Sequence, residues 1–466
     1  MTQTLDVNAT YLSKLSRFYG DRGASPIPEA VLDKARRVLV DFLSEVAAGH
    51  KTGEFPALCA EYLISLGGAP ESTILCHGSK VPAINGALAL GALGHSIELD
   101  DGHRWGTCHP AVAIIPAALV MAEREGSDFT SLLRAIVVGY DVMLRAARAI
   151  NPSHLKWGFH STGTCGSLGA AAACASLKNF GPESFAYAVA LGGLQSAGLQ
   201  EMLHDHPGIK PLQPGKAAMA GVLAADLVDR GAKGPRSLFE GEHGWLKAMC
   251  RNEFSEEALM GELGDRWEIM YTYTKLYPTC RHCHAAIDLA KEGKQALGLT
   301  LDDIESIHVK TYALGIAEVG RIFTPATFEE AMFSLPFSVS IALERGHVTL
   351  RDYDEKTLKN EKLRQTALKM NLEEDEAMNR IYPEERGAWM RIELKDGRSF
   401  EKHIPVAKGE PENPVNDQDL LEKLQGMVNV YYPAEFLAGL WDLCVERPID
   451  SVAYGEIVDH FGRFHS

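Results

Sequence analysis

The feature that most constrains the fold of this 466-residue chain is a set of segments dense in alanine and glycine. Their apolar residues recur at helical spacing. The segments span residues 84–99, 109–123, 166–177, 182–194 and 216–228. Because small side chains let helices approach closely, these segments predict a compact core of several helices. Their glycines lie in helical surroundings and do not follow a strand, so we expect no nucleotide-phosphate loop.

The sequence pattern changes after residue 267. Short stretches of alternating apolar and polar residues now predict strands, and the turn Asp396-Gly397 predicts a hairpin between two of them. The predicted strands are 304–312, 390–394 and 399–404, and the predicted helices among them are 328–344 and 355–370. This part of the chain therefore predicts a smaller α+β domain.

These patterns together predict a fold that is mainly α with a smaller α+β domain. We expect a large all-helical domain formed by residues 1–267 and 406–466, and a smaller α+β lid domain formed by residues 268–405. The return of the C-terminus is inferred from a helix at 417–427. Asn416 is suited to cap this helix, and its leucines would return an apolar face to the helical domain.

Composition excludes several classes of partner. The formal net charge of −16 argues against nucleic acid or an anionic membrane surface as the main partner. The N-terminus lacks the pattern of a signal peptide, and the apolar stretches are too short to span a bilayer. We therefore expect a cytoplasmic protein whose nine cysteines are reduced.

A charged stretch separates two of the apolar segments and reads Glu98-Leu-Asp-Asp-Gly-His-Arg-Trp-Gly-Thr-Cys-His-Pro110. Acids and bases clustered in an apolar setting are what proton-transfer chemistry requires. Pro110 suits the first position of a helix, and a helix N-terminus favours anions. The alternative is a solvated helix end, where adjacent aspartates are common. The expected site residues are His109 and Asp101 for catalysis, and Glu98, His103 and Arg104 for substrate binding.

Two further stretches offer groups for an acidic ligand. His160 precedes the hydroxyl-rich run Ser161-Thr-Gly-Thr164, which could leave backbone N–H groups facing an anion. Lys210 lies between Ile209 and Pro211 and could clamp an anion in an apolar cleft. The structural alternatives are a simple helix cap beside a packing histidine, and a solvated loop lysine.

The stretch Lys275-Leu-Tyr-Pro-Thr-Cys-Arg-His-Cys-His284 allows several interpretations. Cys-x-x-Cys-His matches a c-type haem attachment motif, but that attachment requires export. Zinc would use Cys280, Cys283 and His284, yet no second pair has matching spacing, and an iron–sulfur cluster would need a distant third cysteine. The simpler interpretation is a set of donors for an acidic substrate. The expected site residues are Lys275 for catalysis and Cys280, Arg281 and His282 for substrate binding, with no metal.

Several motifs occur in the same order in the MmgE/PrpD family, which the chain resembles over nearly its whole length. The motifs are Glu98-Leu-Asp-Asp with His109-Pro, Gly158-Phe-His-Ser-Thr-Gly-Thr, Lys210-Pro-Leu with Gly215-Lys-Ala-Ala, Gly234-Pro-Arg with Phe239-Glu-Gly, Lys275 to Asp288, and Glu410-Pro-Glu-Asn-Pro. The family contains 2-methylcitrate dehydratases, cis-aconitate decarboxylases and an iminodisuccinate epimerase. The resemblance implies a helical domain completed by the C-terminus, a smaller α/β lid, a homodimer, and catalysis with neither metal nor organic cofactor.

Carried over by position, the family's catalytic pocket falls on Glu98, Asp101, His109, His160, Lys210, Lys275 and Cys280. The chain departs from the family pattern at Gly102, where dehydratases and decarboxylases usually carry threonine, and near Phe337, where decarboxylases carry an aromatic hydroxyl. We expect a cofactor-independent lyase for a small di- or tricarboxylate, foremost a hydro-lyase of the 2-methylcitrate dehydratase type. The alternatives are a cis-aconitate-type decarboxylase, a dicarboxylate epimerase or isomerase, and a non-catalytic metabolite- or metal-binding protein.

Overall fold

The computed structural model describes residues 6, 8–21, 26–205 and 207–464. The chain divides by its contacts into two compact units. Unit 1 comprises Met1–Ser96, Asp100–Thr272 and Val428–Ser466, and unit 2 comprises Ile97–Leu99 and Tyr273–Met427. The predicted fold class is confirmed, because helices dominate the described residues and a small mixed sheet lies in unit 2.

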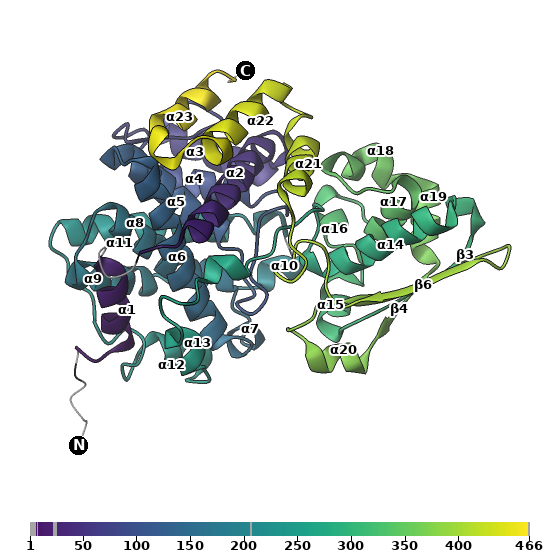
Figure 1. Ribbon diagram of the computed structural model, residues 1–466, viewed down its shortest axis with the longest axis horizontal. Coiled ribbons are helices and arrows are strands. Elements are labelled where there is room, and N and C mark those ends of the chain that lie inside the picture. The colour runs from purple at the N-terminus through teal and green to yellow at the C-terminus, as the bar shows by residue number, and fades with distance from the viewer. Residues whose placement is uncertain (1–5, 7, 22–25, 206, 465–466) are drawn as a thin grey trace. The chain divides into compact units, whose positions relative to one another are not determined.

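Unit 1 is a bundle of helices, and the helix α8 is buried along its whole length because α5, α6, α9 and α11 pack around it (Figure 1). Its helices are α1 (Tyr11–Gly20), α2 (Glu29–Thr52), α3 (Glu54–Ser65), α4 (Ala83–Gly94), α5 (Ala111–Glu125), α6 (Phe129–Ile150), α7 (Ser153–Lys156), α8 (Ser161–Leu177), α9 (Pro182–Gly193), α10 (Glu201–Asp205), α11 (Leu212–Asp229), α12 (Trp245–Cys250), α13 (Glu256–Met260), α22 (Ala434–Trp441) and α23 (Tyr454–Gly462). Two short strands, β1 (Ser72–Thr73) and β2 (Lys80–Val81), pair antiparallel beside them.

Glycines explain how closely these helices pack. A methyl group at Gly91 of α4 would lie only 2.7 Å from the Cα atom of Gly215 in α11. A methyl group at Gly139 of α6 would lie 2.9 Å from the carbonyl oxygen of Gly169 in α8. The backbones touch where a side chain is absent, as the alanine- and glycine-rich pattern predicts.

Unit 2 contains a four-stranded sheet with the order β4-β3-β5-β6. The strand β3 (Ile304–Thr311) runs parallel to β4 (Met370–Glu374) and antiparallel to β5 (Ala388–Leu394), which pairs antiparallel with β6 (Ser399–Ile404). The predicted hairpin is confirmed. Alternate residues of β5, including Met390 and Ile392, enter the core of unit 2. The helix α14 (His284–Leu297) packs on β5 and β6, and α17 (Leu335–Arg345) packs against α14 (Figure 1).

Three predicted helices end early or divide in the structure, and a fourth is not the last helix of the chain. The helix expected over 84–99 ends at Gly94, so the charged stretch begins as a loop. The helix expected over 328–344 is two helices, α16 (Phe328–Met332) and α17, because Ser334 caps the second one. The helix expected over 355–370 is α18 (Glu355–Leu358) and α19 (Glu361–Leu368), with Asn360 as the new cap. The helix predicted last in the chain, α21 (Asp417–Val428), is followed by α22 and α23.

Residues 406–427 group with unit 2, whereas the sequence analysis assigned them to the helical domain. Ion pairs join Lys408 to Asp419 at 3.0 Å and Arg281 to Glu410 at 3.0 Å. The amide of Lys408 also donates to Asp288 of α14. As predicted, Asn416 caps α21 by accepting from the amide of Asp419 at 2.8 Å. The remaining described helices of unit 2 are α15 (Ala313–Val319) and α20 (Glu376–Ile381).

Candidate functional site

The charged stretch links α4 to α5 as a loop with an unusual backbone. Its residues Ile97–Leu99 belong to unit 2, and the chain re-enters unit 1 at Asp100. Glu98 and Thr107 have positive φ angles of 53° and 47°. This left-handed conformation costs free energy for residues other than glycine and is concentrated at functional sites. The loop therefore carries backbone strain where sequence analysis placed catalytic groups.

Asp100 joins two histidines of unit 1. Its Oδ2 atom lies 3.0 Å from Nδ1 of His95 and 3.0 Å from Nδ1 of His109. The Nδ1 atom of His109 also lies 2.8 Å from the carbonyl oxygen of Asp101. Since both neighbours of that nitrogen are acceptors, Nδ1 carries the hydrogen and Nε2 of the neutral ring carries the lone pair. The contact of Asp100 with Nδ1 resembles the one by which an aspartate holds the tautomer of a histidine in catalytic triads.

The two partners differ in exposure. Asp100 is fully buried, whereas the side chain of His109 is 16% exposed. The amide of His109 donates to Oγ1 of Thr162 at 3.1 Å, which attaches the start of α5 to the start of α8. The carboxylate that contacts His109 is therefore that of Asp100, and Asp101 contributes only its carbonyl oxygen.

The carboxyl group of Asp101 lies at the N-terminus of α5. Its Oδ1 atom accepts from the amide of Ala111 at 3.1 Å, and its Oδ2 atom accepts from the hydroxyl of Tyr140 at 3.0 Å. Burial raises the pKa of Asp101 to about 7, and the neighbouring Asp100 adds to the rise. The hydrogen bonds from Ala111 and Tyr140 act in the opposite direction. At neutral pH this carboxyl group therefore exists in both protonation states.

His160 and Lys210 lie near this cluster in unit 1. Burial lowers the pKa of His160 well below its ordinary value, and the charges of Lys210, His95 and His109 lower it further. The Nδ1 atom of His160 lies 2.7 Å from Oε1 of Gln213. Lys210 is itself only 5% exposed. The structure thus brings together a neutral histidine and a buried lysine.

His103 and Arg104 contact other residues of unit 1. His103 accepts at Nδ1 from the amide of Gly106 at 3.0 Å, and its Nε2 atom lies 3.4 Å from Glu268. The guanidinium of Arg104 lies over the ring of Trp105, 4.1 Å from its centroid. Both side chains are buried. These contacts hold the two side chains within the loop, and their expected role in substrate binding stays a prediction.

Unit 2 holds a buried ion pair. The Nζ atom of Lys275 lies 2.9 Å from Oε2 of Glu98, and the two side chains are 0% and 4% exposed. Breaking such a pair by removing one partner leaves a buried charge without its counterion. The sequence analysis assigned both residues to the site, and the structure pairs them.

Arg281 is engaged within unit 2. Its Nε atom donates to Glu410 at 3.0 Å, and its other nitrogens reach the carbonyl oxygen of Lys408 at 3.1 Å. The ring of His284 lies 3.0 Å from the guanidinium, and burial lowers the pKa of His284 well below its ordinary value. This guanidinium fastens the segment after β6 to the start of α14.

Cys280 and His282 meet a third residue, Glu318 of α15. The Sγ atom of Cys280 lies 3.9 Å from Oε2 of Glu318, and Nε2 of His282 lies 3.2 Å from the same oxygen. Cys283 is instead buried in the core of unit 2. Burial raises the pKa of Cys280 to about 12, so the thiol is protonated at neutral pH. The structure groups Cys280 with His282 and Glu318. The sequence motif had instead suggested Cys280, Cys283 and His284 as the possible zinc ligands.

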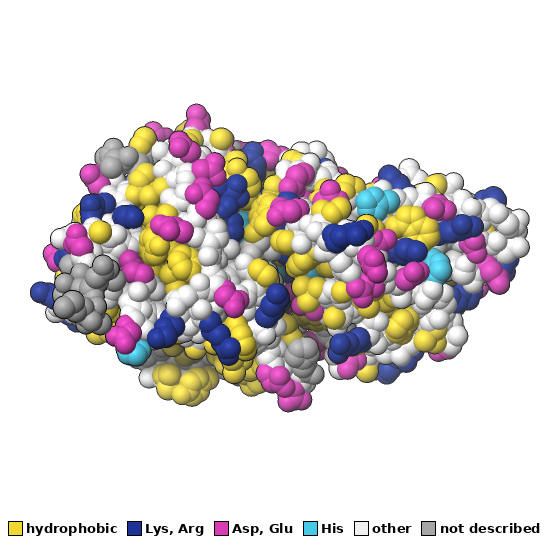
Figure 2. Space-filling model, turned by 90° about the horizontal axis from the view of Figure 1, so that it is seen from below, with side chains coloured by type: hydrophobic (Ala, Val, Ile, Leu, Met, Phe, Trp, Pro, Cys, Tyr) yellow, Lys and Arg dark blue, Asp and Glu magenta, His cyan; other side chains and the backbone are white. Residues whose placement is uncertain are grey.

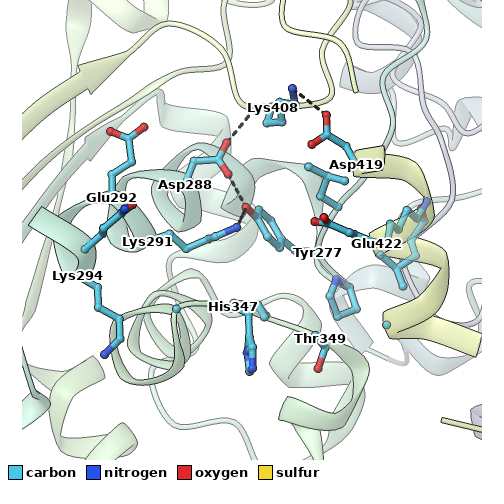
Figure 3. Close-up of a pocket in the computed structure, with 18 of the residues that line it drawn as sticks. Tyr277, Asp288, Lys291, Glu292, Lys294, His347, Thr349, Lys408, Asp419 and Glu422 are labelled. Atoms are coloured by element: carbon cyan, nitrogen blue, oxygen red, sulfur yellow. Dashed lines mark hydrogen bonds and ion pairs between the residues drawn. The ribbon is translucent and has the colours of Figure 1, made fainter. Parts of the chain in front are cut away.

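Unit 2 also contains a pocket of about 1010 Å³ between α14, α21 and the loop after α17 (Figure 3). Its lysines already have partners: Lys291 donates to the hydroxyl of Tyr277, and Lys408 pairs with Asp419. Asp288 accepts from the same tyrosine at 2.6 Å. None of the described residues lining the pocket belongs to the predicted site. The pocket is nevertheless lined by Leu99 and Leu276, the chain neighbours of Glu98 and Lys275.

Comparison with known proteins decides the family. The MmgE/PrpD N-terminal domain matches residues 13–257, and the MmgE/PrpD C-terminal domain matches residues 277–438. The chain belongs to the MmgE/PrpD family. This MmgE/PrpD chain is 24% identical over 447 residues to the cis-aconitate decarboxylase-like protein oryM of Aspergillus oryzae, with 89% of each chain covered. It is 25% identical over 419 residues to the cis-aconitate decarboxylase of Homo sapiens, with 86% of this chain and 84% of that protein covered.

Within the described part of this family member, no helix is both long and apolar enough to cross a membrane. On the face drawn in Figure 2, acidic and basic side chains of the described residues are interspersed. Such a surface gives no sign of the basic stripe that a nucleic-acid backbone requires.

Sequence reasoning missed several residues that complete these clusters. His95 follows the end of α4, Tyr140 is one of many buried residues of α6, and Gln213 lies in the first turn of α11. Glu318 lies 38 residues beyond Cys280. Nothing in the local sequence marks these positions, since each acquires its role from a tertiary contact. The three acidic and three basic residues of the Glu98-to-Pro110 stretch were the available signal for the first cluster.

Proposed function

We propose that the chain is a lyase that acts on a small di- or tricarboxylate by acid–base chemistry at His109. The observation that carries this proposal is the geometry of unit 1. Asp100 orients His109, and beside them lies Asp101, a second buried carboxyl group whose pKa is about 7. A base with a fixed tautomer next to an acid that is partly protonated at neutral pH is the pair that elimination chemistry needs.

In the proposed dehydration, Nε2 of His109 removes a proton from the carbon beside a substrate carboxylate. The electron pair of that C–H bond forms the new double bond, and the C–O bond to the β-hydroxyl breaks. Asp101 gives its proton to the departing hydroxide, so that water leaves. Lys210 supports the step by balancing the negative charge that develops on the substrate. His160, which is neutral and buried beside Lys210, donates at Nδ1 to Oε1 of Gln213, so its Nε2 would accept a hydrogen bond from a substrate hydroxyl.

Lys275 is proposed as a second residue required for turnover, on the strength of its place in the family motif. In unit 2 its ammonium is already paired with the carboxylate of Glu98. A ligand that reached Lys275 would therefore meet an ion pair and not an isolated positive charge. We propose 2-methylcitrate-like hydroxy acids as the substrate class. Family resemblance also predicts a homodimer and catalysis with neither metal nor organic cofactor, which light scattering, and mass and elemental analysis of the active protein, would test.

Decarboxylation is the second candidate, because both relatives named above are called cis-aconitate decarboxylases or are described as like one. In that reaction a C–C bond breaks, CO₂ leaves, and an acid delivers a proton to the carbon. The electron pair of the broken C–C bond takes up that proton, so this reaction needs the acid and no base to remove a C–H proton. Epimerisation would need only removal and return of the proton.

One experiment separates these reactions. The purified protein is incubated with 2-methylcitrate, citrate and cis-aconitate in deuterated buffer, and the products are followed by ultraviolet absorbance and proton NMR. Dehydration predicts an unsaturated product from the hydroxy acids, and decarboxylation predicts CO₂ release from cis-aconitate. Deuterium exchange without elimination favours epimerisation. No reaction with any substrate at high enzyme concentration contradicts the proposed lyase function.

A matched pair of lysine variants tests the role of Lys210. Lys210→Met is expected to lower kcat/KM by roughly 10²-fold or more, since it removes a cation that balances developing charge. Lys233→Met changes an exposed lysine of the same unit and should retain activity. Equal activity of the two variants would remove Lys210 from the proposed site.

A further inference from the structure

Three metal-ligating side chains of unit 2 point to one place. Cys280 precedes the short 3₁₀ helix at Arg281–Cys283, His282 lies within it, and Glu318 lies on α15. One donor atom from each lies within 4.8 Å of the other two. The measured pairs are 3.9 Å from Sγ of Cys280 to Oε2 of Glu318, and 3.2 Å from Nε2 of His282 to that oxygen.

These distances fit a tetrahedral ion. Zinc bonds to sulfur at about 2.3 Å and to nitrogen or oxygen at about 2.0–2.1 Å, which places tetrahedral donors roughly 3.3–3.6 Å apart. Two of the three donor pairs, at 3.9 and 3.2 Å, lie within a few tenths of an ångström of this range. The third pair, Cys280 with His282, lies within 4.8 Å and would shorten as the side chains close onto an ion. Thiolate, imidazole and carboxylate are also the ligand types that zinc accepts.

The surroundings of His282 match those of a metal ligand. Its Nδ1 atom is hydrogen-bonded to the hydroxyl of Tyr312, so that Nε2 faces Glu318. Metal-bound histidines almost always use their second nitrogen in such an outer hydrogen bond, which fixes the ring and its tautomer. The amide of Cys280 donates to the carbonyl oxygen of Met332 at 2.9 Å, which anchors the cysteine backbone as well.

We propose that Cys280, His282 and Glu318 bind a divalent transition-metal ion, with zinc as the best-fitting ion. This assignment goes beyond the proposed lyase function and does not depend on it. It also departs from the sequence analysis, which expected no metal and would have placed zinc on Cys280, Cys283 and His284. Three protein ligands leave a fourth position for water or a carboxylate, as in zinc sites that are not purely structural. Binding replaces the thiol proton of Cys280, which leaves to solvent.

The competing explanation is an ordinary ion pair between His282 and Glu318 with a thiol beside it. The two explanations differ in what they require of the sulfur. An ion pair makes no use of a thiolate at Cys280, whereas a metal site makes its thiolate a direct ligand. A cobalt complex with a thiolate ligand also shows a sulfur-to-metal charge-transfer band, which an ion pair cannot produce.

The test uses the full chain, stripped with a chelator and titrated with Zn²⁺ and separately with Co²⁺. We expect one equivalent of metal per chain and a thiolate charge-transfer band with cobalt. Cys280→Ser should abolish the band and weaken zinc binding by about 100-fold or more, given that outer-shell changes alone cost 10- to 100-fold. Cys283→Ser is the matched control, because this thiol lies three residues away but faces the core. It should keep both the band and the affinity.

A second variant keeps the proposal testable if Cys280→Ser fails to fold. Glu318→Gln removes the charge of a side chain that is 27% exposed, so the fold should tolerate it. It is expected to weaken zinc binding at least 10-fold while leaving the circular dichroism spectrum unchanged. The proposal is overturned if the wild-type chain binds less than one equivalent of zinc, or if Cys280→Ser and Glu318→Gln bind zinc as tightly as Cys283→Ser does.

Discussion

Two clusters of similar residues differ in how their donors are arranged. In unit 1, the first cluster consists of His95, Asp100, Asp101 and His109, and the Nδ1 atoms of both histidines lie against oxygen acceptors of the two aspartates. In unit 2, the second cluster consists of Cys280, His282 and Glu318, and one possible ligand atom of each lies within 4.8 Å of the other two. Both contain a histidine beside a carboxylate. The first arrangement favours one tautomer of His109, and the second groups three types of metal ligand.

The two clusters differ in which ring nitrogen of the histidine faces an oxygen, and in what else approaches that oxygen. Nδ1 of His109 faces two oxygen acceptors, which leaves Nε2 to exchange protons. Nε2 of His282 faces the same carboxylate oxygen that the thiol of Cys280 approaches. Residue type alone therefore does not separate a general base from a metal ligand. The geometry of the neighbouring atoms does.

The largest effect is expected from His109→Ala. Removing the general base should lower kcat/KM by roughly 10³-fold, because positioned acids and bases contribute 10²- to 10⁴-fold. Steady-state kinetics on the best substrate measures this loss. The exposed His77→Ala is the control and should keep full activity. If the two clusters act independently, His109→Ala should bind zinc as tightly as the wild type does. Weaker zinc binding by this variant would show that the clusters are coupled.

Asp100→Asn should have the next largest effect. The amide can present its N–H group to His109 and favour the wrong tautomer, so kcat should fall by roughly 10²-fold or more while KM changes little. Asp100 acts through the histidine, and a purely structural role would alter stability without this split between kcat and KM. A variant with normal kcat would show that the carboxylate does not orient the base.

The metal cluster should reveal itself as a change in stability. At a free zinc concentration of 100 times the dissociation constant, the folded state gains about 2.7 kcal/mol. His282→Gln should lose this gain, and His403→Gln, which alters an exposed histidine of β6, should keep it. Thermal denaturation with and without zinc measures the difference. A zinc-induced rise in Tm that survives in His282→Gln would place the ion elsewhere.

The smallest effect concerns Asp101 and pH. Since burial raises its pKa to about 7 from an unfolded value near 3.8, the folded chain binds more protons between these values and loses stability as pH rises through them. Between pH 5.5 and 7.5 this amounts to on the order of 2 kcal/mol. Asp101→Asn should remove that part of the pH dependence, measured as the difference in unfolding free energy between variant and wild type. A constant difference across the range would contradict the raised pKa.

Much of the fold was predictable because periodicity is a local property. The alanine- and glycine-rich helices and the hairpin of β5 and β6 follow from spacing and turn chemistry that can be counted along the chain. The strand β4 was missed because it follows closely after a helix. It also pairs in parallel with a strand about 60 residues earlier, with Met370 opposite Ile307. The early end of α4 at Gly94 was missed for a similar reason, since the apolar run continues beyond it.

The site was predictable only where its residues are adjacent in sequence. Asp101 and His109 stood out because they share one short stretch, but the partners that orient them did not. Tyr140 and Thr162 come from α6 and α8, and only tertiary packing brings them to α5. For Cys280, the sequence suggested Cys283 as its partner, and the structure offers Glu318 instead. A Cys-x-x-Cys spacing says nothing about which side of the backbone each thiol faces.

The backbone contact between Gly91 and Gly215 has a consequence for redesign. Gly91 lies one turn before His95, and Gly215 lies one turn after Lys210, so the contact joins the helix ends that carry these two groups. Helices that touch backbone to backbone cannot be moved closer, and any added atom would push them apart. The distance between the end of α4 and the start of α11 is thus fixed by backbone contact. Reshaping this part of unit 1 would require exchanging side chains on these helices, because the helices themselves have no room to move closer.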